Sequence, residues 1–163
     1  MGRALVTIDN VYANNLGTFR KIIDVVLPVQ YPGEYFEEVV DKNAKGVFYA
    51  QLAYYGEIAI GAVKSRLIAN KTGGVKPAGM YIEVLAVLEA YRGKTAGSLM
   101  LKYIEDKCKE SFQHDIYVHV ATDNETAIEW YEKNGFSRDG DILENYYKNT
   151  TGSNDAFVYK KSV

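Results

Sequence analysis

The feature that most constrains this chain is an apolar strand pattern that passes through a short basic loop into an amphipathic helix. Residues 80–88 predict a strand whose centre is buried on both faces, and residues 95–110 predict a helix with one apolar stripe. The loop between them contains Arg92, Gly93 and Lys94. Because a helix N-terminus presents unpaired N–H groups and a partial positive charge, this turn fits a pyrophosphate-bearing ligand. A plain strand-to-helix turn with a solvated basic pair has the same local pattern.

Strand and helix patterns alternate along the rest of the chain, without an internal repeat or a long linker. The other predicted strands span residues 4–8, 47–54, 58–68, 115–121, 136–147 and 156–160, and the other predicted helices span 14–27, 34–41 and 123–134. Seven strands and four helices in this order predict one α/β domain over residues 1–163, built as a mixed sheet with helices on both faces.

Charge and cysteine content exclude several classes of function. The 19 basic and 21 acidic residues give a net charge of −2, which argues against a broad surface for nucleic acid or an anionic membrane. With Cys108 as the single cysteine and only two histidines, neither a disulfide framework nor a metal site is expected. No apolar run approaches the ~18 residues of a membrane span and no signal peptide is recognisable, so the expected compartment is the cytoplasm.

A second informative stretch runs from the strand at 115–121 into the helix at 123–134. His119 alternates with apolar neighbours and therefore faces the opposite side of its strand, where a lone histidine is usually structural. Asn124 fits the N-cap of the helix. Tyr131, on the same helix, fits either the core or a pocket. Neither stretch identifies a function by itself.

Together the two stretches resemble the GNAT superfamily of acetyl-CoA-dependent N-acetyltransferases. The matching positions are Arg92, Thr95, Gly97, Asn124, Ala127, Tyr131, Gly135 and Phe136. The resemblance implies the GNAT fold, with a mostly antiparallel seven-stranded sheet, and acetyl-CoA as the cofactor. It implies that the coenzyme contacts Leu85, Val87, Arg92, Gly93, Lys94, Thr95, Ala96, Gly97, Asn124 and Tyr131.

A narrower similarity connects the chain with the NatE-type (San) catalytic subunits of protein N-terminal acetyltransferases. It is carried by residues 27–31, 80–82, 117–120 and 145–148. That family acetylates the α-amine of proteins that keep the initiator Met before an apolar residue. It associates with the scaffold and catalytic subunits of the NatA complex at the ribosome. The resemblance implies the same activity and the same partners for this chain.

The same resemblance implies roles for individual side chains. Tyr81 and His119 take the general-base positions and act through a water, while Tyr131 lies near the coenzyme sulfur. The residues expected on the acceptor side are Leu27, Pro28, Val29, Tyr31, Glu83, Tyr146 and Tyr147. This chemistry needs little driving force, since a free α-amine has a pKa of about 7.7–8.0, and it needs no metal.

Two positions depart from the family pattern. Thr95 stands where the coenzyme loop normally has a glycine, so its Cβ is expected to hinder close approach of the pyrophosphate or a positive φ. Glu83 stands where the NatE-type relatives have an apolar Met. Because many other GNAT enzymes have a glutamate base on this strand, Glu83 fits either an additional base or a paired structural carboxylate.

These departures leave two alternatives beside an N-terminal acetyltransferase. Thr95 favours a weakly active or inactive GNAT-shaped subunit that mainly contacts a partner complex, although the Tyr81/His119 pair argues against it. A GNAT enzyme for lysine or a small amine is the second alternative. The adjacent Tyr146 and Tyr147 favour an extended peptide end over a flexible lysine side chain.

Overall fold

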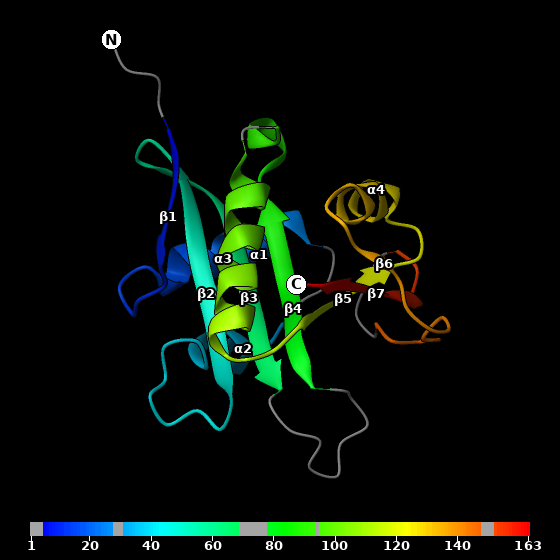
Figure 1. Cartoon of the computed structure of the whole chain (residues 1–163). Coiled ribbons are helices and arrows are strands. Elements are labelled where there is room, and N and C mark those ends of the chain that lie inside the picture. Colours follow the sequence, from blue (N-terminus) through cyan, green and yellow to red (C-terminus); the bar gives the residue numbers. More distant parts are fainter. Residues whose placement is uncertain (1–4, 28–30, 69–77, 94, 148–151) are drawn as a thin grey trace.

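The computed structural model describes residues 5–27, 31–68, 78–93, 95–147 and 152–163. In these residues the strands are β1 (Val6–Asn10), β2 (Val47–Tyr55), β3 (Ile58–Ile68), β4 (Gly79–Val87), β5 (Asp115–Ala121), β6 (Ser137–Arg138) and β7 (Ala156–Ser162). The helices are α1 (Leu16–Val26), α2 (Gly33–Glu37), α3 (Ala96–Glu110) and α4 (Glu125–Lys133), with a short 3-10 turn at Glu89–Tyr91. The strands form one mixed sheet in the order β1-β2-β3-β4-β5-β7-β6 (Figure 1).

One strand pair in this sheet is parallel, and it sets the geometry of the site. The chain leaves β4, crosses the sheet as α3 and returns as β5, so β4 and β5 run in the same direction. Their pairing extends only from Met80 opposite Ile116 to Ile82 opposite Val118. Beyond these residues the two strands separate, while the remaining neighbours in the sheet pair antiparallel.

A β-bulge lies in β4 at the point where the strands separate. Ser65 of β3 pairs with Ile82, but the next residue, Lys64, pairs with Val84, so Glu83 is an extra residue on β4. Because side chains alternate along a strand, an extra residue shifts every later side chain to the opposite face.

The two faces of the sheet carry separate hydrophobic clusters. On one face α3 covers β1 to β4, and the cluster includes Met80, Ile82, Met100, Ile104 and Tyr131. On the other face α1 covers β3 and β4 and α2 packs against α1, and the cluster includes Phe19, Ile23, Phe36, Val84 and Ala86. The prediction of helices on both faces is therefore confirmed. No helix in the described ranges is long and apolar enough to cross a membrane.

The strand predicted over residues 136–147 is mostly wrong. Only Ser137–Arg138 forms a strand, and after it the chain touches β7 through a single bridge between Leu143 and Ala156. Gly140 has φ +79° and Asn145 has φ +54°, which breaks the extended conformation that a strand needs. The predicted run of β4 buried on both faces is also only partly present, since Leu85 and Val87 are half-buried.

Candidate active site

The separation of β4 and β5 opens a cavity in the middle of the sheet. About 110 Å³ is accessible to water-sized molecules, well above the roughly 10–15 Å³ that one water needs. It is lined by Leu27, Tyr31, Glu83, Val84, Leu85, Val118, His119, Val120, Ala121, Asn124, Ala127, Tyr131 and Tyr147. Residues predicted for catalysis, for the coenzyme and for the acceptor thus meet in one cavity, although they come from distant parts of the sequence.

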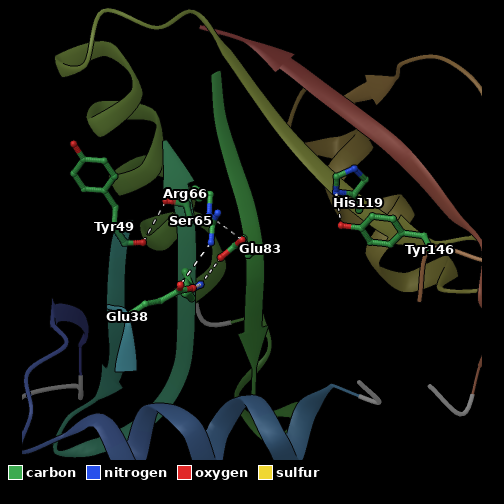
Figure 2. Close-up of polar contacts among 8 residues, drawn as sticks. Glu38, Tyr49, Ser65, Arg66, Glu83, His119 and Tyr146 are labelled. Atoms are coloured by element: carbon green, nitrogen blue, oxygen red, sulfur yellow. Dashed lines mark hydrogen bonds and ion pairs between the residues drawn. The ribbon is translucent and has the colours of Figure 1, made fainter. Parts of the chain in front are cut away.

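His119 lies among tyrosines on one side of this cavity. The Tyr146 hydroxyl is 3.3 Å from His119 Nδ1, and the two rings stack with centroids 4.5 Å apart (Figure 2). The Tyr147 hydroxyl donates to the His119 carbonyl oxygen at 3.2 Å. Tyr81 stacks on Tyr117 of the neighbouring parallel strand, with its ring 6.5 Å from the His119 ring. Register therefore brings Tyr81 and His119 to the same face of the sheet, as the two predicted base positions require.

The tyrosine hydroxyls around the cavity are held in their neutral form. Burial raises the pKa of Tyr31 to about 12, with smaller contributions from Tyr146 and Glu83. Burial likewise raises the pKa of Tyr81, Tyr146 and Tyr147 above the ordinary value for tyrosine. Near neutral pH each hydroxyl is therefore both a hydrogen-bond donor and an acceptor.

Tyr131 borders the cavity from α4. Its ring packs edge-on against Trp130 and Phe136, with centroids 5.1 and 5.2 Å away. Burial raises the pKa of its hydroxyl, so the group stays protonated and can donate a hydrogen bond. Asn124 begins α4, where its side-chain oxygen accepts from the Ala127 N–H at 3.1 Å. The predicted N-cap role of Asn124 is confirmed.

The loop between β4 and α3 is tied down at one end and strained at the other. Arg92 Nε donates to the Val87 carbonyl oxygen at 3.2 Å. Gly93 has φ +80°, which glycine adopts freely, but Thr95 has φ +72°, and a β-branched residue is strained in this region. The Thr95 side chain makes no capping hydrogen bond to α3. Lys94 lies outside the described residues.

Helices α3 and α4 approach each other closely beside this loop. Ala96, the first residue of α3, is buried, and a Cβ built on Gly97 would lie 2.9 Å from the Trp130 ring. Gly97 therefore allows the contact between the start of α3 and α4. In the described part of the chain, no group of three or more His, Cys, Asp or Glu side chains could hold a metal ion.

Of the residues predicted for the acceptor, Leu27 and Tyr31 line the cavity, and the Tyr31 ring stacks on Tyr35 at 4.2 Å. Pro28 and Val29, predicted for the same pocket, lie outside the described residues. Sequence reasoning missed Tyr35. Its only signal was its position in a short aromatic run before a predicted helix.

The two possibilities for Glu83 are now distinguished by its contacts. Its carboxylate forms ion pairs with Lys64 and with Arg66, the latter at 3.6 Å between Nε and Oε2. The same two cations also contact Glu38, at the C-terminal end of α2. Glu83 is therefore a paired carboxylate. Sequence reasoning missed Glu38, Lys64 and Arg66. The available signal was Lys64, a charged residue inside an apolar strand pattern.

Comparison with known proteins agrees with this geometry. The model of the acetyltransferase (GNAT) family matches residues 16–136. The chain belongs to the GNAT family. N-alpha-acetyltransferase 50 of Danio rerio is 32% identical over 162 residues, which cover 97% of this chain and 89% of that protein. The probable N-acetyltransferase san of Drosophila melanogaster is 32% identical over 164 residues, covering 100% of this chain and 84% of that protein.

A solved structure of a relative supports the same assignment. Arabidopsis thaliana Naa50 in complex with the bisubstrate analogue CoA-Ac-MVNAL superposes with a TM-score of 0.81 and 35% identity, over 97% of this chain and 99% of that chain. GNAT acetyltransferases use acetyl-CoA as acetyl donor. The predicted family, the predicted fold and the predicted cofactor are therefore confirmed.

Proposed function

We propose that this GNAT chain transfers the acetyl group of acetyl-CoA to the α-amine of protein N-termini that begin with Met followed by an apolar residue. The cavity between β4 and β5 carries the proposal, because it joins His119, Tyr131 and the acceptor-side Tyr31 and Tyr147 in one space. The Arabidopsis relative was solved with an analogue whose peptide begins with Met, and it matches nearly the whole of both chains.

Tyr81 and His119 accept the proton from the α-amine, through a water. In the tautomer that we assign, Nδ1–H donates to the Tyr146 hydroxyl, 3.3 Å away, and Nε2 carries the lone pair that accepts the proton. Because the α-amine has a pKa of about 7.7–8.0, a neutral imidazole is basic enough for this transfer near neutral pH.

The freed lone pair then attacks the thioester carbonyl. A C–N bond forms and the C–S bond breaks, so the coenzyme leaves as a thiolate, and the second proton that the nitrogen loses passes to this thiolate to give the free thiol. The N–H groups near Leu85 and Val87 that point toward β5 no longer face a paired strand, since pairing stops at Ile82 opposite Val118. We assign these groups to the developing oxyanion. The protonated hydroxyl of Tyr131 donates to the departing sulfur.

The coenzyme pyrophosphate binds to the loop from Arg92 to Gly97, including Lys94 and the N–H groups at the start of α3. The first acceptor residue enters beside Leu27, Pro28, Val29 and Tyr31, and Tyr146 and Tyr147 bond the extended peptide backbone. By the family resemblance, the chain acts in the cytoplasm with NatA-type scaffold and catalytic subunits at the ribosome.

A peptide panel tests the proposal. The pure chain is incubated with acetyl-CoA and with Met-Leu, Met-Lys, Ser-first and α-blocked internal-lysine peptides, and products are read by mass spectrometry. We expect graded acetylation led by Met-Leu, because matching one apolar side chain is worth only about 1–3 kcal/mol. Preferred acetylation of the blocked lysine peptide would contradict the α-amine assignment.

A second function, a GNAT-shaped binding subunit with little coenzyme affinity, is favoured by one observation. The left-handed φ of +72° at Thr95 strains the loop assigned to the pyrophosphate. Calorimetric titration of acetyl-CoA into the pure chain distinguishes the two functions. Saturable binding supports the enzyme, while no binding together with no product from any peptide supports the binding subunit.

A further inference from the structure

A fully buried lysine lies next to the acceptor side of the cavity. Lys64, on β3, has an exposed side-chain fraction of 0%, and its ammonium group contacts the carboxylates of Glu38 at 2.5 Å and of Glu83. Arg66, 43% exposed, lies 3.6 Å from each of the same carboxylates (Figure 2). Two cations and two anions balance, as a group buried this deeply requires. We call these four residues the charge cluster.

The charge cluster joins two elements that do not follow one another in the sequence. Glu38 caps the C-terminal end of α2, while Glu83 is the bulge residue of β4 and lines the cavity. Lys64 is the charged group between them. The charge cluster therefore fastens α2 to the sheet at the point where β4 leaves β5.

A chain of aromatic contacts extends from Lys64 to the cavity. The Lys64 ammonium lies 3.7 Å from the centroid of the Tyr35 ring, on α2, at cation–π distance. The Tyr35 ring stacks on Tyr31 at 4.2 Å, and Tyr31 lines the cavity. Tyr35 also packs edge-on against Phe36, which belongs to the core under α1. Movement of α2 would therefore move the wall of the acceptor pocket.

We propose that Lys64 is a positioning residue for the acceptor: by bridging Glu38 and Glu83 beneath Tyr35, it fixes α2 and hence the Tyr31 wall of the pocket. This inference rests on the proposed function for its kinetic consequence. The structural part, a link between α2 and β4, stands independently of the acceptor. Among the described residues Lys64 contacts Glu38, Glu83, Tyr35 and Phe48, so the role proposed for it concerns the acceptor pocket rather than coenzyme binding or proton transfer.

The test distinguishes the link between α2 and β4 from the balance of charge in the charge cluster. Lys64→Met leaves the charge cluster one negative charge in excess, and we expect the Tm to fall by about 10 °C. The double variant Lys64→Met/Glu38→Gln restores neutrality through the remaining pair of Arg66 and Glu83, so much of the Tm should return. Because α2 is still unfastened, the KM for a Met-first peptide should stay about tenfold raised in both variants. The Kd for acetyl-CoA should be unchanged.

Lys161→Met is the matched control. Lys161 pairs with Glu105 at 2.8 Å on α3, away from the cavity, so its loss should lower the Tm without changing the peptide KM. Recovery of the KM together with the Tm in the double variant would overturn the proposal and leave Lys64 a purely structural charge.

Hydrogen exchange gives a readout that needs no acceptor. The amides of α2 should exchange faster in Lys64→Met and in the double variant, and at the wild-type rate in Lys161→Met. Unchanged exchange of α2 in the double variant would overturn the proposal. If the wild-type chain acetylates no peptide, the proposed function fails, while the exchange measurement still decides whether Lys64 fastens α2.

Discussion

The proposed acceptor side of the cavity and the proposed coenzyme loop between β4 and α3 are built in opposite ways. On the acceptor side, Tyr31 and Glu83 are held by stacking and by ion pairs to a fully buried lysine. On the coenzyme side, Thr95 is exposed, has φ +72° and makes no side-chain cap. The acceptor side is therefore fixed before any ligand arrives, while the loop stores strain that a bound phosphate must offset. Acceptor selectivity and coenzyme affinity should respond to different substitutions.

The largest effect is expected at His119. Its replacement by alanine should lower kcat by about 10²–10⁴-fold, because it removes the proton acceptor, with little change in the Kd for acetyl-CoA. Tyr81→Phe should act in the same direction, and the double variant should be little worse than the poorer single one, since groups that act together are non-additive. Steady-state kinetics and calorimetry measure the two quantities.

His114→Ala is the matched histidine control, since His114 is exposed in the loop after α3, and it should keep the wild-type kcat. Near-normal turnover in His119→Ala would contradict the assignment of His119 as the proton acceptor.

Gly97→Ala tests the close contact of α3 and α4. A Cβ there would lie 2.9 Å from the Trp130 ring, so the change should lower stability by about 1–3 kcal/mol and weaken acetyl-CoA binding. Gly17→Ala, in α1, has no heavy atom within 4 Å of the new Cβ and should raise stability by about 0.5–1 kcal/mol. Equal Tm shifts in the two variants would show that a Cβ at Gly97 does not disturb the contact between α3 and α4.

Thr95→Gly tests the strain in the loop between β4 and α3. Removing the side chain from a left-handed position should relieve about 1–2 kcal/mol, raise the Tm by a few degrees and tighten acetyl-CoA. Thr95→Ala keeps a Cβ in the same conformation and should give little of this gain. If Thr95→Gly binds acetyl-CoA no better than the wild type, strain in the loop does not limit affinity.

The smallest effect is expected from the titration of Tyr31. Burial raises its pKa from the ordinary value of 10.0 to about 12, so the folded chain holds this proton more tightly than the unfolded chain does. The resulting stability is present below pH 10 and is lost as the pH rises toward 12, by about 1 kcal/mol at pH 11. Tyr31→Phe should reduce this loss in urea unfolding measured between pH 9 and 11. An unchanged slope would argue against burial as the cause.

Much of the fold could be predicted because its elements are long and periodic. The helix over 95–110 and the strand over 115–121 match α3 and β5 to within a residue. The strand predicted over 136–147 is wrong beyond Arg138, because Gly140 and Asn145 turn the backbone to positive φ. The Asp139-Gly140 pair was the sequence signal for this turn, and the strand prediction passed over it.

The candidate site divides in the same way. Asn124 and Tyr131 belong to motifs, so the resemblance indicated them as site residues before the structure showed both lining the cavity. The charge cluster follows no motif, because Glu38 lies far in sequence from Lys64 and Glu83, and their meeting depends on how α2 packs on the sheet. Long-range pairing of this kind requires three-dimensional contacts that no local pattern specifies.

The extra residue in β4 also changes how that strand tolerates insertions and deletions. Met80 and Ile82 face α3, yet after Glu83 it is Leu85 and Val87 that pack on that face, while Val84 and Ala86 join the cluster under α1. Deleting Glu83 would restore simple alternation, and both halves of the strand could then no longer bury their apolar side chains in the present arrangement. A single inserted residue thus lets one strand serve two cores in succession, and the change-over coincides with the opening of the cavity.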